Sequence, residues 1–185
     1  MPSSYTDLGL ELMVTGENSG TWGDKTNTNL QLVQQGFAGY QEVSIAGGAQ
    51  TTALAVTDGT VSNGRNAVIK FTGTITGNQV VTIPDTIEKT YTIINGTTGA
   101  FTVEFKTVSG TGFTFAAADK GTRLAYADGT NVVDVNAAFT TISQFTLPTA
   151  DGTADQALIT DASGNLSFSG PFATNGKAIA FAIVF

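Results

Sequence analysis

The residue types that most enzymes use for nucleophilic and acid–base chemistry are sparse in this chain. Its 185 residues include no His and no Cys. A Ser-His or Cys-His mechanism is therefore excluded, and zinc loses its commonest ligands. The 15 acidic residues leave a two-carboxylate glycoside hydrolase open, with Glu88 and Glu104 as an example of a pair. Because spacing in the sequence cannot place any pair at the required separation, we predict no catalytic residue and no cofactor.

A second candidate chemistry is cation binding by oxygen ligands in the last third of the chain. Asp161, Ser163 and Asn165 alternate around Gly164, so their side chains could face one calcium ion. The segment lacks the longer ligand series and the terminal acidic residue of a calcium-binding loop. We interpret it as a polar turn and predict no metal site.

Aromatic side chains could stack on a sugar or fill a pocket of a partner protein. The chain has one Trp and four Tyr. We expect Tyr91 and Tyr126 to face the core, since they belong to alternating strand patterns. Trp22 lies in a turn-rich loop where Gly20 and Gly23 would let the backbone approach another surface. We predict Trp22 as an interface anchor; a packed Trp in an ordinary connection is the alternative.

Composition and charge narrow the classes of partner. The formal net charge is -7 with only 8 Lys and Arg, so the chain would repel a phosphate backbone, and we exclude nucleic acid. The first residues lack the positive and apolar regions of a secretory signal. The longest apolar run, residues 178–185, is far shorter than the roughly 20 residues of a membrane-spanning helix, so we expect no membrane span.

One helix is predicted over residues 27–38. Leu30, Val33 and Phe37 recur there at intervals of three and four residues. Thr26 or Asn27 is the expected N-cap, and Gly39 is placed to end the helix. The apolar stripe is narrow, which is typical of a helix that lies against something larger.

Between residues 42 and 136, apolar and polar residues alternate with period two. Turn dipeptides such as Asn95-Gly96 and Asp128-Gly129 separate the runs. We predict about eight or nine strands and a mainly β fold: an antiparallel β-sandwich or small barrel, with a short N-terminal helix and an extended β-rich C-terminal arm. Pro84 is expected to end a strand. The Asp-Gly-Thr triplets are unequally spaced, so we predict no repeat architecture.

These patterns divide the chain into three regions. Residues 1–40 form an N-terminal attachment segment with a loop and a helix, residues 41–136 the β-domain, and residues 137–185 the C-terminal arm. The run at residues 178–185 would aggregate if exposed, so it is either the last strand of the main domain or packs against other copies of the chain. The residues predicted to oligomerise are Leu158, Leu166, Phe168, Ile179, Phe181, Ile183 and Phe185.

Several stretches of the sequence resemble one family. Residues 10–30 (LELMVTGENSGTWGDKTNTNL) are similar to the N-terminal module of tail-fibre-like virion proteins from marine tailed bacteriophages, of the cyanophage and pelagiphage type. Residues 147–168 resemble shaft and tip segments of phage fibres, and residues 91–95 (YTIIN) and 128–133 (DGTNVV) fit the same group. The resemblance implies a virion structural protein whose N-terminal part attaches to the particle and whose distal part trimerises or meets the host.

The leading interpretation is a non-enzymatic virion protein, a tail fibre or adaptor, located on the tail in preference to the capsid surface. Its implied partners are copies of itself, with a trimer favoured, and other virion proteins. The alternatives are a receptor-recognition module that binds a host cell-surface glycan, a capsid-surface decoration protein, and a small depolymerase. The residues predicted to contact other virion proteins are Gly20, Trp22, Gly23, Leu30, Val33 and Phe37.

Overall fold

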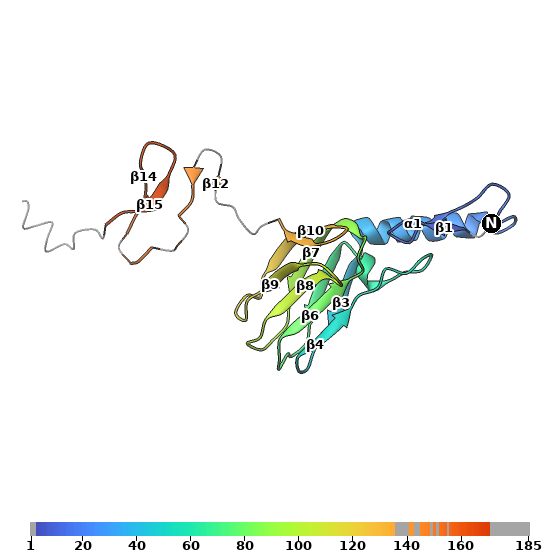
Figure 1. Ribbon diagram of the computed structural model, residues 1–185, viewed down its shortest axis with the longest axis horizontal. Helices are drawn as coiled ribbons and strands as arrows, with labels where there is room; N and C mark the ends of the chain where they lie inside the picture. Colours follow the sequence, from blue (N-terminus) through green and yellow to red (C-terminus); the bar gives the residue numbers. More distant parts are fainter. Residues whose placement is uncertain are drawn as a thin grey trace, which may run out of the picture. The chain divides into compact units, whose positions relative to one another are not determined.

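The computed structural model describes residues 3–135, 141–142, 145–148, 150, 152–154 and 156–170. The chain divides into two compact units, Met1–Asn136 and Ala137–Phe185, and each is described by itself. The fold is mainly β, with one α-helix, mixed and antiparallel sheets, and no closed barrel in the described part of the chain (Figure 1). The predicted mainly β class and the N-terminal helix are confirmed.

Two sheets form most of the first unit. The five-stranded sheet has the order β11-β10-β7-β5-β3, and the four-stranded sheet has the order β4-β6-β8-β9. The first contains β3 (Tyr40–Ser44), β5 (Val68–Thr72), β7 (Glu88–Asn95), β10 (Thr122–Asp128) and β11 (Val132–Asp134). The second contains β4 (Gln50–Ala53), β6 (Gln79–Ile83), β8 (Val103–Thr107) and β9 (Gly112–Phe115). As predicted, Pro84 directly follows the end of a strand.

The strands from β3 to β8 pair in parallel. In the five-stranded sheet β5 lies between β3 and β7, and in the four-stranded sheet β6 lies between β4 and β8, with all four pairs parallel. The chain alternates between the sheets, so β3–β4, β5–β6 and β7–β8 are successive coils that stack on one another. This is a short β-solenoid. The expectation of purely antiparallel strands is wrong, and so is the expectation that no repeat architecture occurs.

The stacking has a spacing of 24 residues between the second and third coils. Val68 lies opposite Thr92, and the Ser109 backbone N–H and hydroxyl donate hydrogen bonds of 3.0 and 2.7 Å to the Asp85 carboxylate one coil away. These bonds hold the pKa of Asp85 below its ordinary value. The first coil is longer, since Tyr40 lies opposite Val68, 28 residues ahead. Turn dipeptides mark the corners of coils as well as hairpins, so the sequence pattern did not separate the two folds.

Antiparallel strands cover the last coil. β9 pairs with β8, β10 with β7, and β11 with β10, all antiparallel. The β10–β11 turn follows its sequence signal: Gly129 has a φ of +83°, and Asp128 Oδ1 accepts the backbone N–H groups of Thr130 and Asn131. A solenoid needs such a terminal cap because its last repeat would otherwise expose an open edge.

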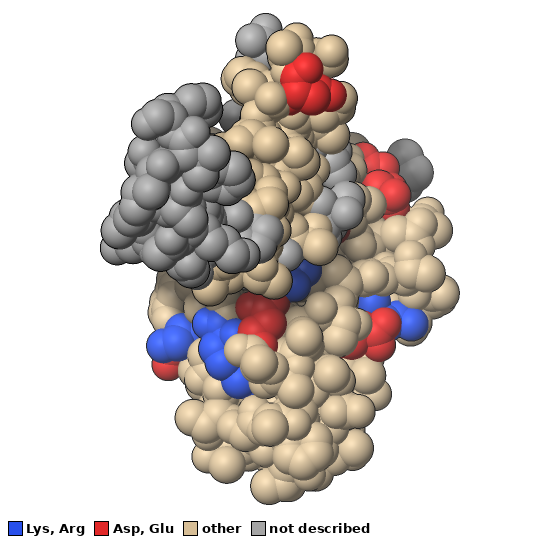
Figure 2. Space-filling view, turned by 90° about the vertical axis from the view of Figure 1, so that its left-hand side faces the viewer, with Lys and Arg blue, Asp and Glu red and all other residues tan. Residues whose placement is uncertain are grey.

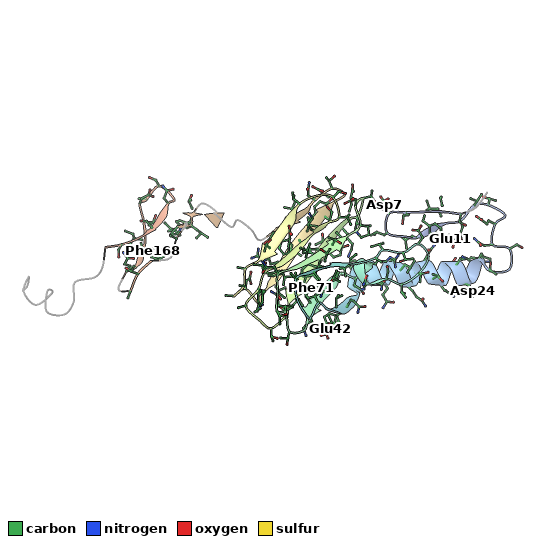
Figure 3. All side chains as sticks on the ribbon, turned by 60° about the horizontal axis from the view of Figure 1, so that its bottom comes forward. Asp7, Glu11, Asp24, Glu42, Phe71 and Phe168 are labelled. Atoms are coloured by element: carbon green, nitrogen blue, oxygen red, sulfur yellow. The ribbon has the colours of Figure 1, made fainter. Side chains whose placement is uncertain are left out.

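Apolar side chains from both sheets meet in one core. Phe105 is fully buried, and its ring lies 6.0 Å from Phe71, 5.7 Å from Tyr91 and 6.0 Å from Phe113, measured between ring centroids. Phe71, labelled in Figure 3, is fully buried in this core. These tilted and edge-to-face contacts are the geometry that aromatic rings prefer. Tyr91 is buried as predicted.

The helix α1 (Trp22–Ala38) begins about one turn earlier than predicted. Trp22 is therefore its first residue and does not lie in a loop; Thr21 is the N-cap. Asp24 lies in the first turn, where a carboxylate interacts favourably with the helix dipole. Gly39 ends the helix as predicted, and its N–H donates to the Gln35 carbonyl at 3.0 Å.

A short hairpin of β1 (Ser4–Tyr5) and β2 (Glu11–Leu12) runs alongside α1 (Figures 1 and 3). The Asn29 side chain exchanges two hydrogen bonds of 2.9 Å with the backbone of Glu11, as a neighbouring strand would. Lys25 forms a 2.9 Å ion pair with the Glu11 carboxylate, and this bond lowers the pKa of Glu11. One face of α1 is thus occupied by the chain itself.

The buried guanidinium of Arg65 joins the helix, the hairpin and the sheets. Arg65 ends a 3-10 turn, η1 (Asn63–Arg65), and is fully buried. Its Nε donates to the Leu8 carbonyl at 2.7 Å, Nη1 to Gln35 Oε1 at 3.0 Å and to the Thr60 carbonyl at 2.7 Å, and Nη2 to the Thr57 carbonyl at 2.5 Å. Burial lowers the pKa of Arg65. Because a buried charge is costly unless its donors are satisfied, these bonds fix three segments at once.

The described part of the second unit consists of two short antiparallel pairs. β12 (Thr141–Ile142) pairs with β13 (Phe145–Thr146), and β14 (Leu158–Thr160) pairs with β15 (Leu166–Phe168).

Replacing Phe105 by Ala should lower the free energy of unfolding by about 3–5 kcal/mol, because the change leaves a cavity among three aromatic rings. Urea denaturation followed by circular dichroism measures the loss. Val108→Ala, at an exposed residue just after the same strand, is the control and should change stability by less than about 1 kcal/mol. Equal losses for both variants would contradict the described core.

Candidate functional site

The outward face of α1 carries three apolar side chains in solvent. Leu30 is 62% exposed, Val33 51% and Phe37 87%. We call these three residues the helix stripe. Leu32, which is fully buried, marks the opposite, inward face. A soluble monomer has little reason to expose a row of large apolar side chains, so the helix stripe is a candidate contact surface.

The other residues predicted beside the stripe lie at the start of the helix. Trp22 is 64% exposed at the first helical position. Gly20, in the preceding turn, has a φ of +82°, a conformation that favours glycine. Gly23 is helical and has no such requirement. All six residues predicted to contact other virion proteins lie in α1 or in the turn before it. Three of them, Leu30, Val33 and Phe37, form the helix stripe.

Two hollows flank the Phe37 side chain. The first has a volume of about 240 Å³, is mainly apolar, and is lined by Leu8, Leu10, Leu32, Val33, Gly36 and Phe37. The second has a volume of about 470 Å³ and reaches the outer face of the five-stranded sheet, where Val68, Thr90 and Thr92 line it. Phe37 lines both hollows, so the helix stripe and the sheet face share one surface.

The outer face of the five-stranded sheet is also apolar. Cross-strand register places Tyr40, Val68, Thr92, Leu124 and Val135 in one outward row. Tyr126 and Val133 lie opposite each other in the next row. We call the large apolar members of these rows the sheet patch; they are Tyr40, Val68, Leu124, Tyr126, Val133 and Val135, of which all but Val68 are exposed.

Tyr126 does not face the core, which corrects the prediction for this residue. It is 42% exposed, while its neighbours Ala125 and Ala127 are fully buried. Both faces of β10 carry apolar side chains, so the period-two pattern did not identify the inward face; the smaller residues are the buried ones.

The outer face of the four-stranded sheet has a different character. Its register places Thr51, Val80, Glu104 and Thr114 in one row, and Ala53, Thr82, Lys106 and Gly112 in the other. Glu104 lies on this face, whereas Glu88 alternates outward on the five-stranded sheet. The two carboxylates that could have formed a glycosidase pair therefore face away from each other on opposite sheets.

Lys89 lines the larger hollow with a perturbed ammonium group. Its Nζ donates 2.9 Å hydrogen bonds to the carbonyls of Arg65 and Asn66 and lies 3.9 Å from the centroid of the Tyr91 ring. Burial, together with the charge of Arg65, lowers the pKa of Lys89 to about 8. The ammonium therefore donates its hydrogen bonds to backbone carbonyls of the same chain.

The residues predicted to oligomerise in the second unit are described only in part. Leu158 on β14 is 52% exposed, and Leu166 and Phe168 on β15 are half-buried. Ile179, Phe181, Ile183 and Phe185 lie outside the described residues. The β14–β15 hairpin therefore offers at least one exposed apolar side chain.

In the polar turn of this hairpin, the Asp161 carboxylate accepts its hydrogen bonds from groups within the turn. Asp161 Oδ1 accepts the backbone N–H groups of Ser163 and Asn165 at 2.8 and 3.0 Å, and Oδ2 accepts the Asn165 amide at 2.6 Å. The hydrogen bond from the Asn165 amide contributes most to the lowered pKa of Asp161. These bonds support the interpretation as a polar turn, because the carboxylate is already engaged within the loop.

Charged groups outside this turn are dispersed. Among the described residues, no cluster of three or more acidic residues is arranged to hold a metal ion, and none of their helices is long and apolar enough to cross a membrane. On the face drawn in Figure 2, Lys and Arg lie near Asp and Glu in small groups separated by uncharged surface.

The sheet patch was missed by reasoning from the sequence. Of its members, only Tyr126 was assigned a side of the sheet, and that side was the core. A signal did exist: Ala125, Ala127 and Val132, of opposite parity, are also apolar, which indicates a strand with two apolar faces.

Lys89→Met keeps the apolar stem and removes the ammonium. The unfolded chain holds the Lys89 proton up to its ordinary pKa of 10.5, whereas the folded protein releases it near pH 8, so between these values the unfolded state binds more protons. The stability of the unmodified protein should therefore rise relative to the variant by about 1–2 kcal/mol from pH 8 to pH 10. Urea unfolding of both proteins at several pH values measures this difference; a constant difference would contradict the lowered pKa.

Comparison with known proteins gives no relative: no family model, no curated protein and no solved structure matches this chain.

Proposed function

We propose that this chain is a non-enzymatic structural protein of a tailed-bacteriophage particle, a tail fibre or an adaptor that links a fibre to the particle. It works as a homo-oligomer, with three copies favoured, and contacts other virion proteins. The tail is its proposed location, in preference to the capsid surface. This proposal combines the resemblance of residues 10–30 and 147–168 to fibre proteins with the surface described above.

The observation that carries the proposal is the helix stripe. Leu30, Val33 and Phe37 bring apolar area and no reactive group, which is the chemistry of a protein–protein contact. The chain has neither His nor Cys, and the carboxylates considered for hydrolysis face opposite ways. Association through apolar burial therefore fits these residues better than catalysis.

The test is to locate the chain in particles made from the genome that encodes it. Antibodies raised against the purified chain should label the tails of negatively stained particles, and mass spectrometry of gradient-purified particles should detect the chain. Preimmune serum is the control. Labelling of heads would favour the capsid-surface alternative, and a chain found only in the particle-free lysate would contradict a virion role.

A glycan-binding role is the second candidate, because Trp22, Tyr40 and Tyr126 are exposed aromatic side chains that could stack on sugar rings. If the oligomer recognises a host glycan, a glycan array should show selective binding that Tyr126→Ala or Trp22→Ala reduces at least about 10-fold. Val108→Ala, at an exposed position away from these rings, is the control. No binding by the multivalent protein would argue against receptor recognition.

A further inference from the structure

We infer that the helix stripe and the sheet patch together form one interface between three parallel copies of this chain. The inference rests on the proposed function for the premise that the chain is an assembly protein. It goes further by naming the occupant of the surface, since the sequence had assigned this helix to other virion proteins and self-association to the C-terminal strands.

The spacing of the stripe is that of a coiled-coil seam. Leu30, Val33 and Phe37 follow one another at intervals of three and four residues, which are the a, d and next a positions of a heptad; α1 ends at Ala38, and Tyr40 lies in β3. A stripe restricted to a and d positions is the narrow seam of a coiled coil, so we infer another helix as its partner in place of the larger surface expected from the sequence. Leu at an a position followed by a β-branched residue at d favours three or four helices over two.

The chain itself does not fill this seam. The inward face of α1 is taken by Leu32, which is buried, by Asn29 on the Glu11 backbone, and by Lys25 in its ion pair. The seam residues lie on the other side of the helix and remain exposed. Their partners must therefore come from outside the described part of this unit.

The surface continues without a break from the helix onto the sheet. Phe37 lines the same hollow as Val68, Thr90 and Thr92, and Tyr40 begins the strand that follows the helix. Copies that meet along the seam would therefore also bring their sheet patches together. Phe37 protrudes between two hollows, so each copy offers both a ring and a place to receive one, as a cyclic interface requires.

Electrostatics favour a second copy of this chain over a charged partner. No side chain of the helix stripe or the sheet patch carries a charge, although the chain has a formal net charge of -7. On the same outer face, Glu42 pairs with Lys70 at 2.9 Å in the row beyond Tyr40, and the exposed Glu88 and Asp128 lie opposite each other in the row beyond Tyr126. The apolar rows between these charged ends are where identical acidic chains approach with least repulsion.

Light scattering of the full chain tests the assembly. We expect three times the chain mass of 19.0 kDa, and Phe37→Glu should raise the dissociation constant at least about 10-fold and release monomers. Gln31→Glu is the matched control: it adds the same charge at an exposed position on the same helix, outside the stripe, and should stay trimeric. Unchanged circular dichroism verifies folding. A monomeric unmodified chain, or equal effects of both variants, would overturn the inference.

Cysteine cross-linking tests the parallel arrangement, because the chain has no Cys of its own. In a parallel seam each residue meets its own counterpart, so oxidised Leu30→Cys should form disulfide-linked pairs, and a three-armed maleimide should link three chains. Gln31→Cys should do neither. Cross-linking by Gln31→Cys but not by Leu30→Cys would overturn the seam, and products limited to two chains would overturn the threefold arrangement.

Two further variants separate the sheet patch from the C-terminal hairpin. Tyr126→Glu should weaken the trimer, whereas Thr114→Glu, at an exposed position on the outer face of the four-stranded sheet, should not. Leu158→Glu on the β14–β15 hairpin should leave the trimer intact; dissociation by Leu158→Glu but not by Phe37→Glu would overturn the inference. Particle labelling is independent of these results. A monomer found on tails refutes the interface and the proposed homo-oligomer but not the virion role, and a trimer absent from particles refutes the virion role but not the interface.

Discussion

The arrangement of the first unit depends on one buried cation. The Arg65 guanidinium meets no carboxylate among its hydrogen-bond partners and is held by the carbonyls of Leu8, Thr57 and Thr60 and by the Gln35 amide. A charge removed from water is tolerated only when its donors are satisfied, so the hairpin, the helix and the loop must all be in place together. Gly9 shows how tight this is: a Cβ there would lie 2.6 Å from Arg65 Nη2.

The hydrogen bonds of the Arg65 guanidinium explain why α1 can expose an apolar face and still be held against the sheets. The helix is secured by polar bonds on its inward side, at Lys25, Asn29 and Gln35, with little apolar burial beyond Leu32. Its outward face carries none of these polar bonds. The same division occurs in the sheets, where the core lies between the layers, one outer face is apolar and the other is mainly polar. The side chains that build the core are thus different from the apolar side chains left exposed.

Local features could be predicted from the sequence, whereas pairing could not. The stripe at Leu30, Val33 and Phe37, the helix end at Gly39 and the hairpin turn at Asp128-Gly129 depend on neighbours within a few residues. The parallel coils depend on contacts about 24 residues apart, and one regular repeat is too few to reveal a period. The inward face of β10 also escaped prediction, because Leu124 and Ala125 are both apolar and only the second sheet decides between them. No sequence signal indicated that Arg65 would be buried, since three of its four acceptors are backbone carbonyls, which every residue has.

The hydrogen bonds from Ser109 to Asp85 link equivalent corners of two successive coils. The antiparallel strands β9 to β11, which form the cap, pair only with the last coil and with each other. A module of this kind can change length in whole steps. Inserting or deleting about 24 residues would move the cap by one strand spacing, roughly 4.8 Å, while both ends keep their local contacts. The two ends could then evolve separately, one under selection for what surrounds the helix and the other for whatever follows the cap, with the number of coils acting as a spacer between them.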